Sequence, residues 1–260
     1  MNNVLATYSL WQRELLRFFR QPSRLAGAFA MPLLFWLLIG NGLSSSFRLP
    51  GGPADLDYLE YFFPGTLVLL VLFGAIFSTF SVIDDRNEGF LQGVLVAPVA
   101  RGAIVMGKIL GGASLAWLQG MIVLCLAPLA GITLTANTVL AAAGVLAMLS
   151  VAMTSLGFAF AWKIDSTQGF HAVMNVILLP MWFLSGAFFP VAGAPIWLEW
   201  IMRLNPLTYG IAAMRHVLSF QSAGTGEDLP SLAVCLIVLA VWCVGCVLLD
   251  LLVVRTGVRA

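Results

Sequence analysis

The sequence predicts an all-α membrane protein with six transmembrane helices, and three observations lead to this fold class. Apolar and aromatic residues make up 60% of the 260 residues and charged residues only 10%, whereas a soluble domain carries about a quarter charged residues. The mean hydropathy is +0.97. The uncharged stretches are also long, and about 20 apolar residues in a helix cross the roughly 30 Å of bilayer hydrocarbon.

The six expected spans are separated by charged or turn-forming residues. Residues 25–47 and 61–83 are uncharged runs of suitable length. The run 109–162 is too long for one helix, and the turn residues in its middle divide it into two spans. A fifth span fits after His171, and residues 229–249 supply the sixth. We therefore expect spans near 25–46, 62–83, 106–130, 138–162, 171–189 and 230–254, within one transmembrane domain that covers residues 23–260.

Basic residues indicate the orientation, because loops rich in Lys and Arg stay on the cytoplasmic side. With a cytoplasmic N-terminus, ten of the 13 Lys and Arg residues face inward, and only Arg48, Arg203 and Arg215 face outward. We therefore expect both termini in the cytoplasm. The net charge of +1, without a basic cluster outside the apolar runs, predicts no nucleic-acid partner.

Residues 1–22 are expected to form a separate amphipathic helix. Apolar residues recur at spacings of three and four, and arginines occupy another face, which is typical of a helix in the cytoplasmic membrane interface. The alternative is that residues 15–19 begin the first span, but Pro22 favours a break before it. The residues concerned are Tyr8, Trp11, Leu15 and Phe18 on the apolar face and Arg13, Arg17 and Arg20 on the other.

The segment after the second span, 84–98, has the pattern of a short cytoplasmic helix. Its charged opening suits a helix N-terminus, and Pro98 ends it. An apolar stripe follows, which either docks in the groove of a partner protein or lies against lipid or the chain's own helices. The pattern leaves both interpretations open. The stripe consists of Phe90, Leu91, Val94 and Leu95.

Residues 190–220 do not have the pattern of a span. Pro190 and Pro195 interrupt the chain, and two short segments follow around Asn205-Pro206. They are too short and too charged to cross the membrane. We therefore expect a re-entrant pair of helices that dips back from the outer face before the sixth span.

No motif in the sequence predicts catalysis. Residues 102–108 match a phosphate loop, but Ile109 replaces the Ser or Thr that holds magnesium, and the buried strand that such a loop follows is missing. Gly107 and Gly111 instead predict close helix packing. We therefore expect neither a catalytic site nor a metal site, and no cofactor bound by this chain.

Ionisable and thiol groups near the spans are expected to have structural roles. His171 and Asp165 lie at the predicted cytoplasmic rim, where a solvated loop is favoured over an intramembrane role. Asp250 closes the last span beside Arg255, which is typical of an interface pair. The four cysteines, including the C-x-x-C pair at 243–246, lie in apolar stretches that favour packing over redox chemistry.

Aromatic side chains are numerous in the first and fifth spans. A subset is expected to line a path for an amphiphile, since aromatic rings offer stacking and apolar contact. The alternative is that they form the aromatic belts that membrane proteins place at the lipid interface. The candidate path residues are Phe35, Trp36, Trp182, Phe183, Phe188 and Phe189.

Four local sequences, taken in order, carry a resemblance to a known family. They are Phe63-Pro64-Gly65, Arg86-Asn87-Glu88-Gly89 with Leu95-Val96-Ala97-Pro98-Val99, Leu184-Ser185-Gly186-Ala187-Phe188-Phe189-Pro190, and Leu204-Asn205-Pro206-Leu207-Thr208-Tyr209 followed by Arg215. Together with the order of spans and short helices, they resemble the type-2 ABC transporter permease family over nearly the full chain. The local likeness is to the multidrug-type branch.

The resemblance implies a half-size permease of a bacterial inner (plasma) membrane, which forms a homodimer and binds two copies of a separate ATPase that holds ATP and Mg. Its function would be export of an amphipathic or hydrophobic substrate, such as a drug, a lipid or a lipid-linked saccharide. Spans one, two and five are expected near the dimer centre. The alternative function is a secondary transporter or channel without an ATPase partner.

The resemblance also implies roles for three groups of residues. The helix after span two is expected to couple the permease to the ATPase, and the N-terminal helix is expected to make a further contact with it. The hairpin before span six is expected to close the outer exit. These groups are Glu88, Gly89, Phe90, Leu91, Val94 and Leu95; Arg13, Arg17 and Phe18; and Asn205, Pro206 and Tyr209.

Overall fold

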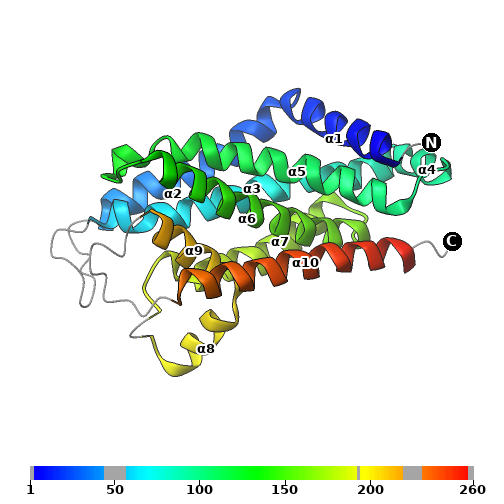
Figure 1. The fold of residues 1–260 in the computed structure, drawn as a ribbon. Helices are drawn as coiled ribbons and strands as arrows, with labels where there is room; N and C mark the ends of the chain where they lie inside the picture. Colours follow the sequence, from blue (N-terminus) through cyan, green and yellow to red (C-terminus); the bar gives the residue numbers. More distant parts are fainter. Residues whose placement is uncertain (1–2, 44–56, 192–193, 219–229, 257–260) are drawn as a thin grey trace.

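The computed structural model describes residues 3–43, 57–191, 194–218 and 230–256, and every regular element in these ranges is a helix. Six long helices run side by side in a bundle (Figure 1). Each is long and apolar enough to cross a membrane, which confirms the predicted all-α class with six candidate spans. They are α2 (Pro22–Leu43), α3 (Tyr58–Asn87), α5 (Arg101–Leu124), α6 (Ala136–Lys163), α7 (Thr167–Trp182) with the turn η2 (Phe183–Ala187), and α10 (Leu232–Thr256).

Short helices occupy the two ends of the bundle (Figure 1). One end, which we call the terminus end, contains the start of α1 (Asn3–Phe19), the whole of α4 (Phe90–Val96) and the end of α10. The turn η1 (Ala127–Ala130) joins α5 to α6. Helices α8 (Ile196–Leu204) and α9 (Pro206–Val217) lie towards the opposite end, which we call the hairpin end.

Local sequence signals set several helix boundaries. The side chains of Asp57, Thr135 and Ser166 each accept a hydrogen bond from a backbone N–H in the first turn of the helix that follows, as N-cap residues do. Pro22 stands at the first position of α2, three residues after α1 ends, where its missing N–H is not needed. The break expected between residues 1–22 and the first span therefore lies between Phe19 and Pro22.

Helix α3 is the centre of the bundle. Nearly all of its side chains are buried, because it packs against α2, α5, α6, α7 and α9. Helices α2, α7 and α10 lie at the periphery and leave apolar side chains exposed, among them Leu38, Val176 and Val241 at 69%, 73% and 68%. Within one copy α3 is thus enclosed by the chain's own helices, and its expected place near the dimer centre stays a prediction.

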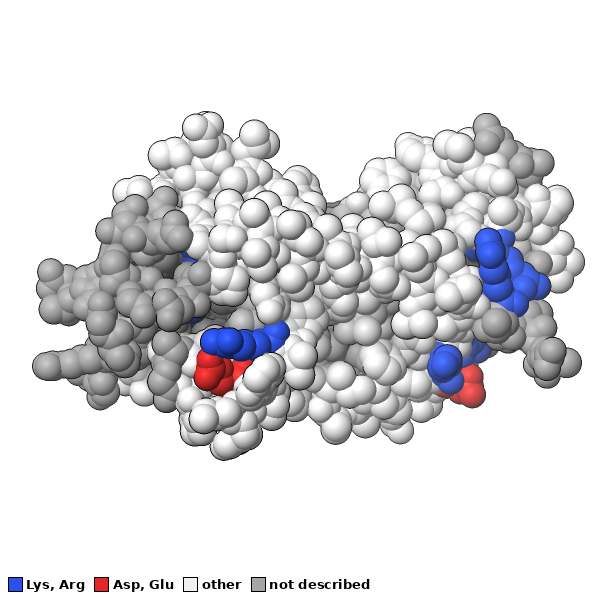
Figure 2. Space-filling view, turned by 60° about the horizontal axis from the view of Figure 1, so that its bottom comes forward, with Lys and Arg blue, Asp and Glu red and all other residues white. Residues whose placement is uncertain are grey.

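The surface between the two ends is apolar. On the face shown in Figure 2, charged side chains gather near the two ends, and a wide uncharged surface separates them. At the hairpin end Arg203 and Glu199 of α8 form an exposed ion pair of 2.5 Å. This distribution is the one expected of a chain whose middle is solvated by lipid.

Candidate functional site

Helix α1 lies along the side of α5, and two glycines make room for it. A Cβ atom added at Gly107 would lie 2.7 Å from the Cβ of Leu10, and one at Gly111 would lie 2.6 Å from the Cβ of Glu14. These separations are shorter than real Cβ contacts, so a larger residue at either position would push α1 away. The close packing predicted from these glycines is thus made with the N-terminal helix.

Side-chain hydrogen bonds fix the same docking. The indole N–H of Trp11 donates to the hydroxyl of Ser114 at 3.1 Å, and the hydroxyl of Thr7 donates to the carbonyl of Ala103 at 3.2 Å. Phe18, predicted as an ATPase contact, is only 4% exposed. The face of α1 that carries Phe18 is therefore turned into the chain itself.

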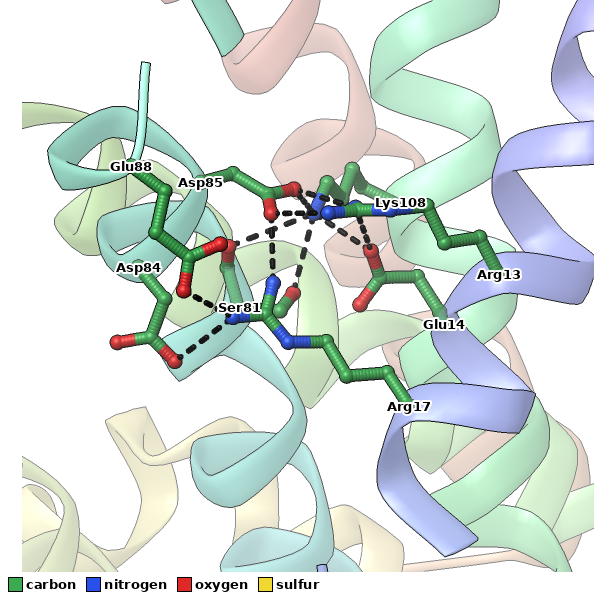
Figure 3. A network of polar contacts seen from close by, with 8 residues as sticks. All are labelled: Arg13, Glu14, Arg17, Ser81, Asp84, Asp85, Glu88 and Lys108. Carbon is green, nitrogen blue, oxygen red and sulfur yellow. Dashed lines mark hydrogen bonds and ion pairs between the residues drawn. The ribbon is translucent and has the colours of Figure 1, made fainter. Parts of the chain in front are cut away.

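Docking of α1 brings together three buried charges. The ammonium group of Lys108 in α5 donates to Glu14 of α1 at 2.5 Å, to Asp85 of α3, and to the hydroxyl of Ser81 at 3.2 Å (Figure 3). Lys108, Glu14 and Asp85 are 5%, 4% and 0% exposed. One cation thus joins α1, α3 and α5 at the terminus end.

Two arginines of α1 complete the binding of Asp85. Arg13 donates to both carboxylate oxygens, at 2.8 and 2.6 Å, in the bidentate geometry that makes such pairs strong. Arg17 donates to the same carboxylate at 2.6 Å and reaches Glu88 at 3.1 Å and Asp84 at 3.4 Å. The hydrogen bonds to Asp85 raise the pKa of Arg13 above its ordinary value. Arg13 and Arg17, which were expected to contact the ATPase, thus bind carboxylates of the chain itself.

We call these eight residues the Asp85 network: Arg13, Glu14, Arg17, Ser81, Asp84, Asp85, Glu88 and Lys108 (Figure 3). A buried ion pair adds little stability over an apolar pair of the same shape, yet removal of one partner costs about 3–5 kcal/mol. The network therefore adds little net free energy of folding. Separation of α1, α3 and α5 would nevertheless be unfavourable, because it would leave buried charges without partners.

Helix α4 connects to this network through its apolar stripe. Gly89 has φ +77° and reverses the chain between α3 and α4. The ring of Phe90 lies 3.7 Å beneath the Arg13 guanidinium, and Leu91, 4% exposed, packs against Leu10 and Ile104. In this single copy, Phe90 and Leu91 of the stripe therefore lie against the chain's own helices, and docking of the stripe on a partner stays a prediction. Val94 packs partly against the same cluster, and the side chain of Leu95 lies outside the described part of the structure.

The opposite face of α4 is open. Glu88, Gly89, Gln92 and Gly93 are exposed, and Val96 is 87% exposed. Two hollows flank this face. An apolar groove of about 390 Å³ lies between α1 and α4, and a polar cleft of about 720 Å³ lies beside Glu88. The groove is lined by Leu5, Ala6, Ser9, Leu10, Gly93, Val94, Ala97 and Val99, and the cleft by Ser9, Gln12, Arg13, Leu16, Arg17, Arg20, Gln21 and Glu88.

Arg86 makes a second connection from α3, to the end of α6. Its guanidinium donates to the carbonyls of Ala161, Trp162 and Ile164 and to the carboxylate of Asp165 at 2.9 Å. Carbonyls in the last turn of a helix have no partner within that helix, so Arg86 caps α6. Asp165, expected in a solvated loop, is exposed there.

The predicted path aromatics divide into two groups. Trp36 and Trp182 are buried within one copy, where their indole N–H groups donate to the carbonyls of Leu59 and Gly65 at 3.1 and 2.9 Å. Phe35 and Phe188 are half-buried, whereas Phe183 and Phe189 are 39% and 37% exposed. The tryptophans therefore pack in the core, and only Phe183 and Phe189 present large surfaces outside the chain.

The residues predicted in the hairpin hold it together. Asn205 caps α9 by accepting a hydrogen bond from the N–H of Leu207 at 3.0 Å, and Pro206 takes the first helical position. The hydroxyl of Tyr209 donates to the carbonyl of Arg203 at 2.9 Å and so joins α9 to α8.

Sequence reasoning missed the centre of the site, formed by Lys108, Asp85 and Glu14. A signal was present, because Lys108 interrupts an apolar stretch at the start of a span and Glu14 stands between two arginines. The partners of these charges lie 23 and 94 residues apart in the sequence, so spacing along the chain does not reveal them.

Comparisons with known proteins agree with this architecture. Residues 6–219 match the model of the family described as ABC-2 type transporter. The chain is 30% identical over 219 residues to ycf38 of Cyanophora paradoxa, a transport permease by its name, covering 83% of this chain and 74% of the relative. It is 28% identical over 213 residues to nodulation protein J of Rhizobium leguminosarum bv. trifolii, covering 81% and 78%. It is 24% identical over 222 residues to the inner membrane transport permease YadH of Escherichia coli (strain K12), covering 82% of each.

The family match at residues 6–219 includes most of α1, all of α4 and the α8–α9 hairpin, and it ends before α10. Permeases of this kind work with separate ABC ATPase subunits and carry no catalytic site themselves. The chain therefore belongs to the ABC-2 type transporter family and is a multi-pass membrane permease that serves transport.

Proposed function

We propose that this chain is the half-size permease of an ATP-driven exporter, which moves an amphipathic or hydrophobic substrate outward. ATP and Mg would be held by the partner ATPase. The observation that carries the proposal is the Asp85 network, which ties α1, α3 and α5 together beside the open face of α4. Ion pairs that hold these three helices together at the edge of the membrane domain are what a permease needs if a partner protein moves it.

The terminus end is the cytoplasmic end in this proposal. Most Lys and Arg residues, among them Arg86, Arg101, Lys163 and Arg255, belong to segments at that end, as expected for the inner side. Exposed apolar side chains of α1, such as Leu5, Leu16 and Phe19, suit a helix lying in the membrane interface. The inner-membrane name of the Escherichia coli relative supports a bacterial inner membrane as the location.

The ATPase, in two copies, would dock on the open face of α4 and in the apolar groove between α4 and α1. Gln92, Gly93 and Val96 would then make the contact, together with Glu88 and Gly89. Phe90 and Leu91 would serve on the opposite side, where they fasten α4 to α1 and α5. Movement of the docked ATPase would thereby reach α3, the central helix, through Arg13 and Asp85.

A second copy of the chain would complete the path. Helices α2 and α7 are peripheral and expose apolar side chains, so we place the homodimer contact there. Phe183 and Phe189 would face the path between the copies, although a lipid belt explains the same exposure. The α8–α9 hairpin would close the outer exit.

The experiment that tests the function uses inverted membrane vesicles that contain the permease and its ATPase. We expect uptake of a fluorescent amphiphilic dye that requires ATP and continues when the proton gradient is collapsed. The control is the same vesicle with an ATPase whose phosphate-loop Lys is replaced by Ala. Uptake that follows the proton gradient and ignores ATP would contradict the proposal.

One observation favours the secondary transporter as a second candidate. Asp250 in α10 is 0% exposed and receives a hydrogen bond from the hydroxyl of Ser155 in α6, not an ion pair with Arg255 as expected. Buried carboxylates inside a membrane domain often serve ion coupling. Asp250→Asn keeps a partner for Ser155. Unchanged ATP-driven uptake in this variant would leave Asp250 a structural role, whereas loss of proton-driven uptake would favour the second candidate.

A further inference from the structure

The membrane helix α7 ends in a break at η2. Leu184 has φ −91° and ψ 25°, and Gly186 has φ +82°, a backbone conformation that glycine adopts without strain. A break of this kind frees backbone carbonyls from their helical hydrogen bonds. Within a membrane domain other groups must bind these carbonyls, because lipid offers no donors.

Side chains of two other helices bind the freed carbonyls. Asn205 at the start of α9 donates to the carbonyls of Met181 and Leu184, the latter at 3.0 Å. From α3, the hydroxyl of Tyr58 donates to the carbonyl of Phe188 at 3.0 Å. The broken end of α7 is thus held between the hairpin on one side and the central helix on the other.

Arg215 makes the charged contact among these connections. Its guanidinium donates to the carbonyl of Gly186 at 2.8 Å and lies 4.1 Å from the ring centre of Tyr61. The Tyr61 hydroxyl donates to the same carbonyl at 3.4 Å. Arg215 is only 3% exposed, so its charge is stabilised by groups of the protein and little by water. A buried guanidinium is costly when such partners are lost.

Helix α9 is therefore pinned to the break at two points. Asn205 begins the helix and Arg215 lies ten residues later, about 15 Å along the axis at 1.5 Å per residue. Loss of the Asn205 contact would leave the far half of α9 in place. The far half also packs through Ile211 and Met214, which are 1% and 0% exposed, so loss of the Arg215 contact would weaken its hold on Gly186 and leave Asn205 as the connection to the break.

We propose that Arg215 is a positioning residue of the outer exit, which keeps the α8–α9 hairpin closed on the broken end of α7. Opening of the exit then requires Arg215 to leave the Gly186 carbonyl, with Asn205 as the pivot. This inference rests on the proposed function only in naming the hairpin end the exit.

The test uses a cysteine at the break as a reporter of opening. Ser185 lies inside η2 and is 1% exposed, and Ser185→Cys changes only oxygen to sulfur. The reporter is placed in a chain whose four native cysteines are replaced by Ala. Its rate of reaction with a membrane-impermeant maleimide, added outside intact cells, is measured without a transported substrate.

We expect slow labelling in the reporter chain and labelling at least ten times faster with Arg215→Met. Loss of a hydrogen bond to a charged group shifts an equilibrium by about that factor or more. Arg215→Lys should restore most of the slow rate, since it keeps the charge but cannot stack on Tyr61 as a planar group. Tyr61→Phe keeps the ring and should raise the rate by a smaller factor.

Arg203→Met is the matched control, because it makes the same change in α8 of the same hairpin at an exposed ion pair. Equal labelling of the Arg203→Met and Arg215→Met chains would overturn the proposal, as would an unchanged rate with Arg215→Met. If the Arg215→Met chain does not reach the membrane, the labelling rate of Tyr61→Phe provides the test. An unchanged rate in Tyr61→Phe would overturn the proposed role of Arg215. Because the ATPase is not needed, failure of export does not affect the result. Labelling of Ser185→Cys only from the inside would contradict the outer location of the hairpin end, but not the contact between Arg215 and Gly186.

Discussion

Lys108→Met removes the buried cation that pairs with both Glu14 and Asp85, while it keeps a side chain of similar length. Asp85 would still bind Arg13 and Arg17, but Glu14, 4% exposed, would lose its closest partner and keep only the longer pair with Arg13 at 3.5 Å. Both side chains of the Lys108–Glu14 pair are at most 5% exposed, so solvent screening is small. The expected loss is that of a broken buried pair, about 3–5 kcal/mol.

Thermal unfolding of the detergent-purified chain measures this loss. At about 2–4 °C per kcal/mol for a chain of this size class, Tm should fall by roughly 6–20 °C. The double variant Lys108→Met with Glu14→Gln removes both charges and should recover most of the difference. Arg203→Met breaks an exposed pair and should lower stability by no more than about 1 kcal/mol.

Two results would refute this reasoning. A Tm for Lys108→Met within the range of the Arg203→Met control would mean that Lys108 and Glu14 are not paired in a buried site. A double variant as unstable as Lys108→Met alone would mean that the loss does not come from the Glu14 carboxylate that has lost Lys108.

Three further predictions concern the same end of the molecule. Gly111→Ala should destabilise the docking of α1, because the new Cβ would lie 2.6 Å from that of Glu14, whereas Gly144→Ala, with nothing within 4 Å, should be neutral or slightly stabilising. Hydrogen exchange of residues 3–19 distinguishes the two variants, and equal exchange would argue against close packing of α1 on Gly111. Val96→Asp should abolish stimulation of the ATPase without changing Tm, whereas Leu91→Ala should lower stability by about 2–5 kcal/mol; a Val96→Asp permease with normal stimulation would exclude the open face of α4 as the docking surface. Deletion of residues 1–20 should both weaken co-purification with the ATPase and lower Tm, because Lys108 and Asp85 lose three partners. A truncated chain with wild-type Tm would show that α1 does not contribute to the Asp85 network.

Much of the fold was predictable because lipid leaves few choices. Long uncharged runs such as 61–83 must form helices to satisfy their backbone groups, and the capping residues Asp57, Thr135 and Ser166 mark the starts of three helices. The short helix after span two was also predicted, but the charged residues 84–88 do not open it: α3 continues to Asn87, and α4 begins only at Phe90. Which side of α4 faces a partner was not predictable, because periodicity identifies a face without identifying what covers it.

The sequence by itself determined the number of spans, the breaks at Pro22 and before Asn205, and the small-residue face at Gly107 and Gly111, since each depends on residues a few positions apart. Only the tertiary structure decided what these features meet. Asp250 illustrates the reason: Arg255 is its neighbour in sequence, but five residues correspond to about 140° around a helix of 3.6 residues per turn, so the two side chains diverge. Asp250 instead meets Ser155, 95 residues away on α6, as Lys108 meets Glu14 on α1. Contacts between distant segments depend on how the helices pack, which no short stretch of the chain specifies.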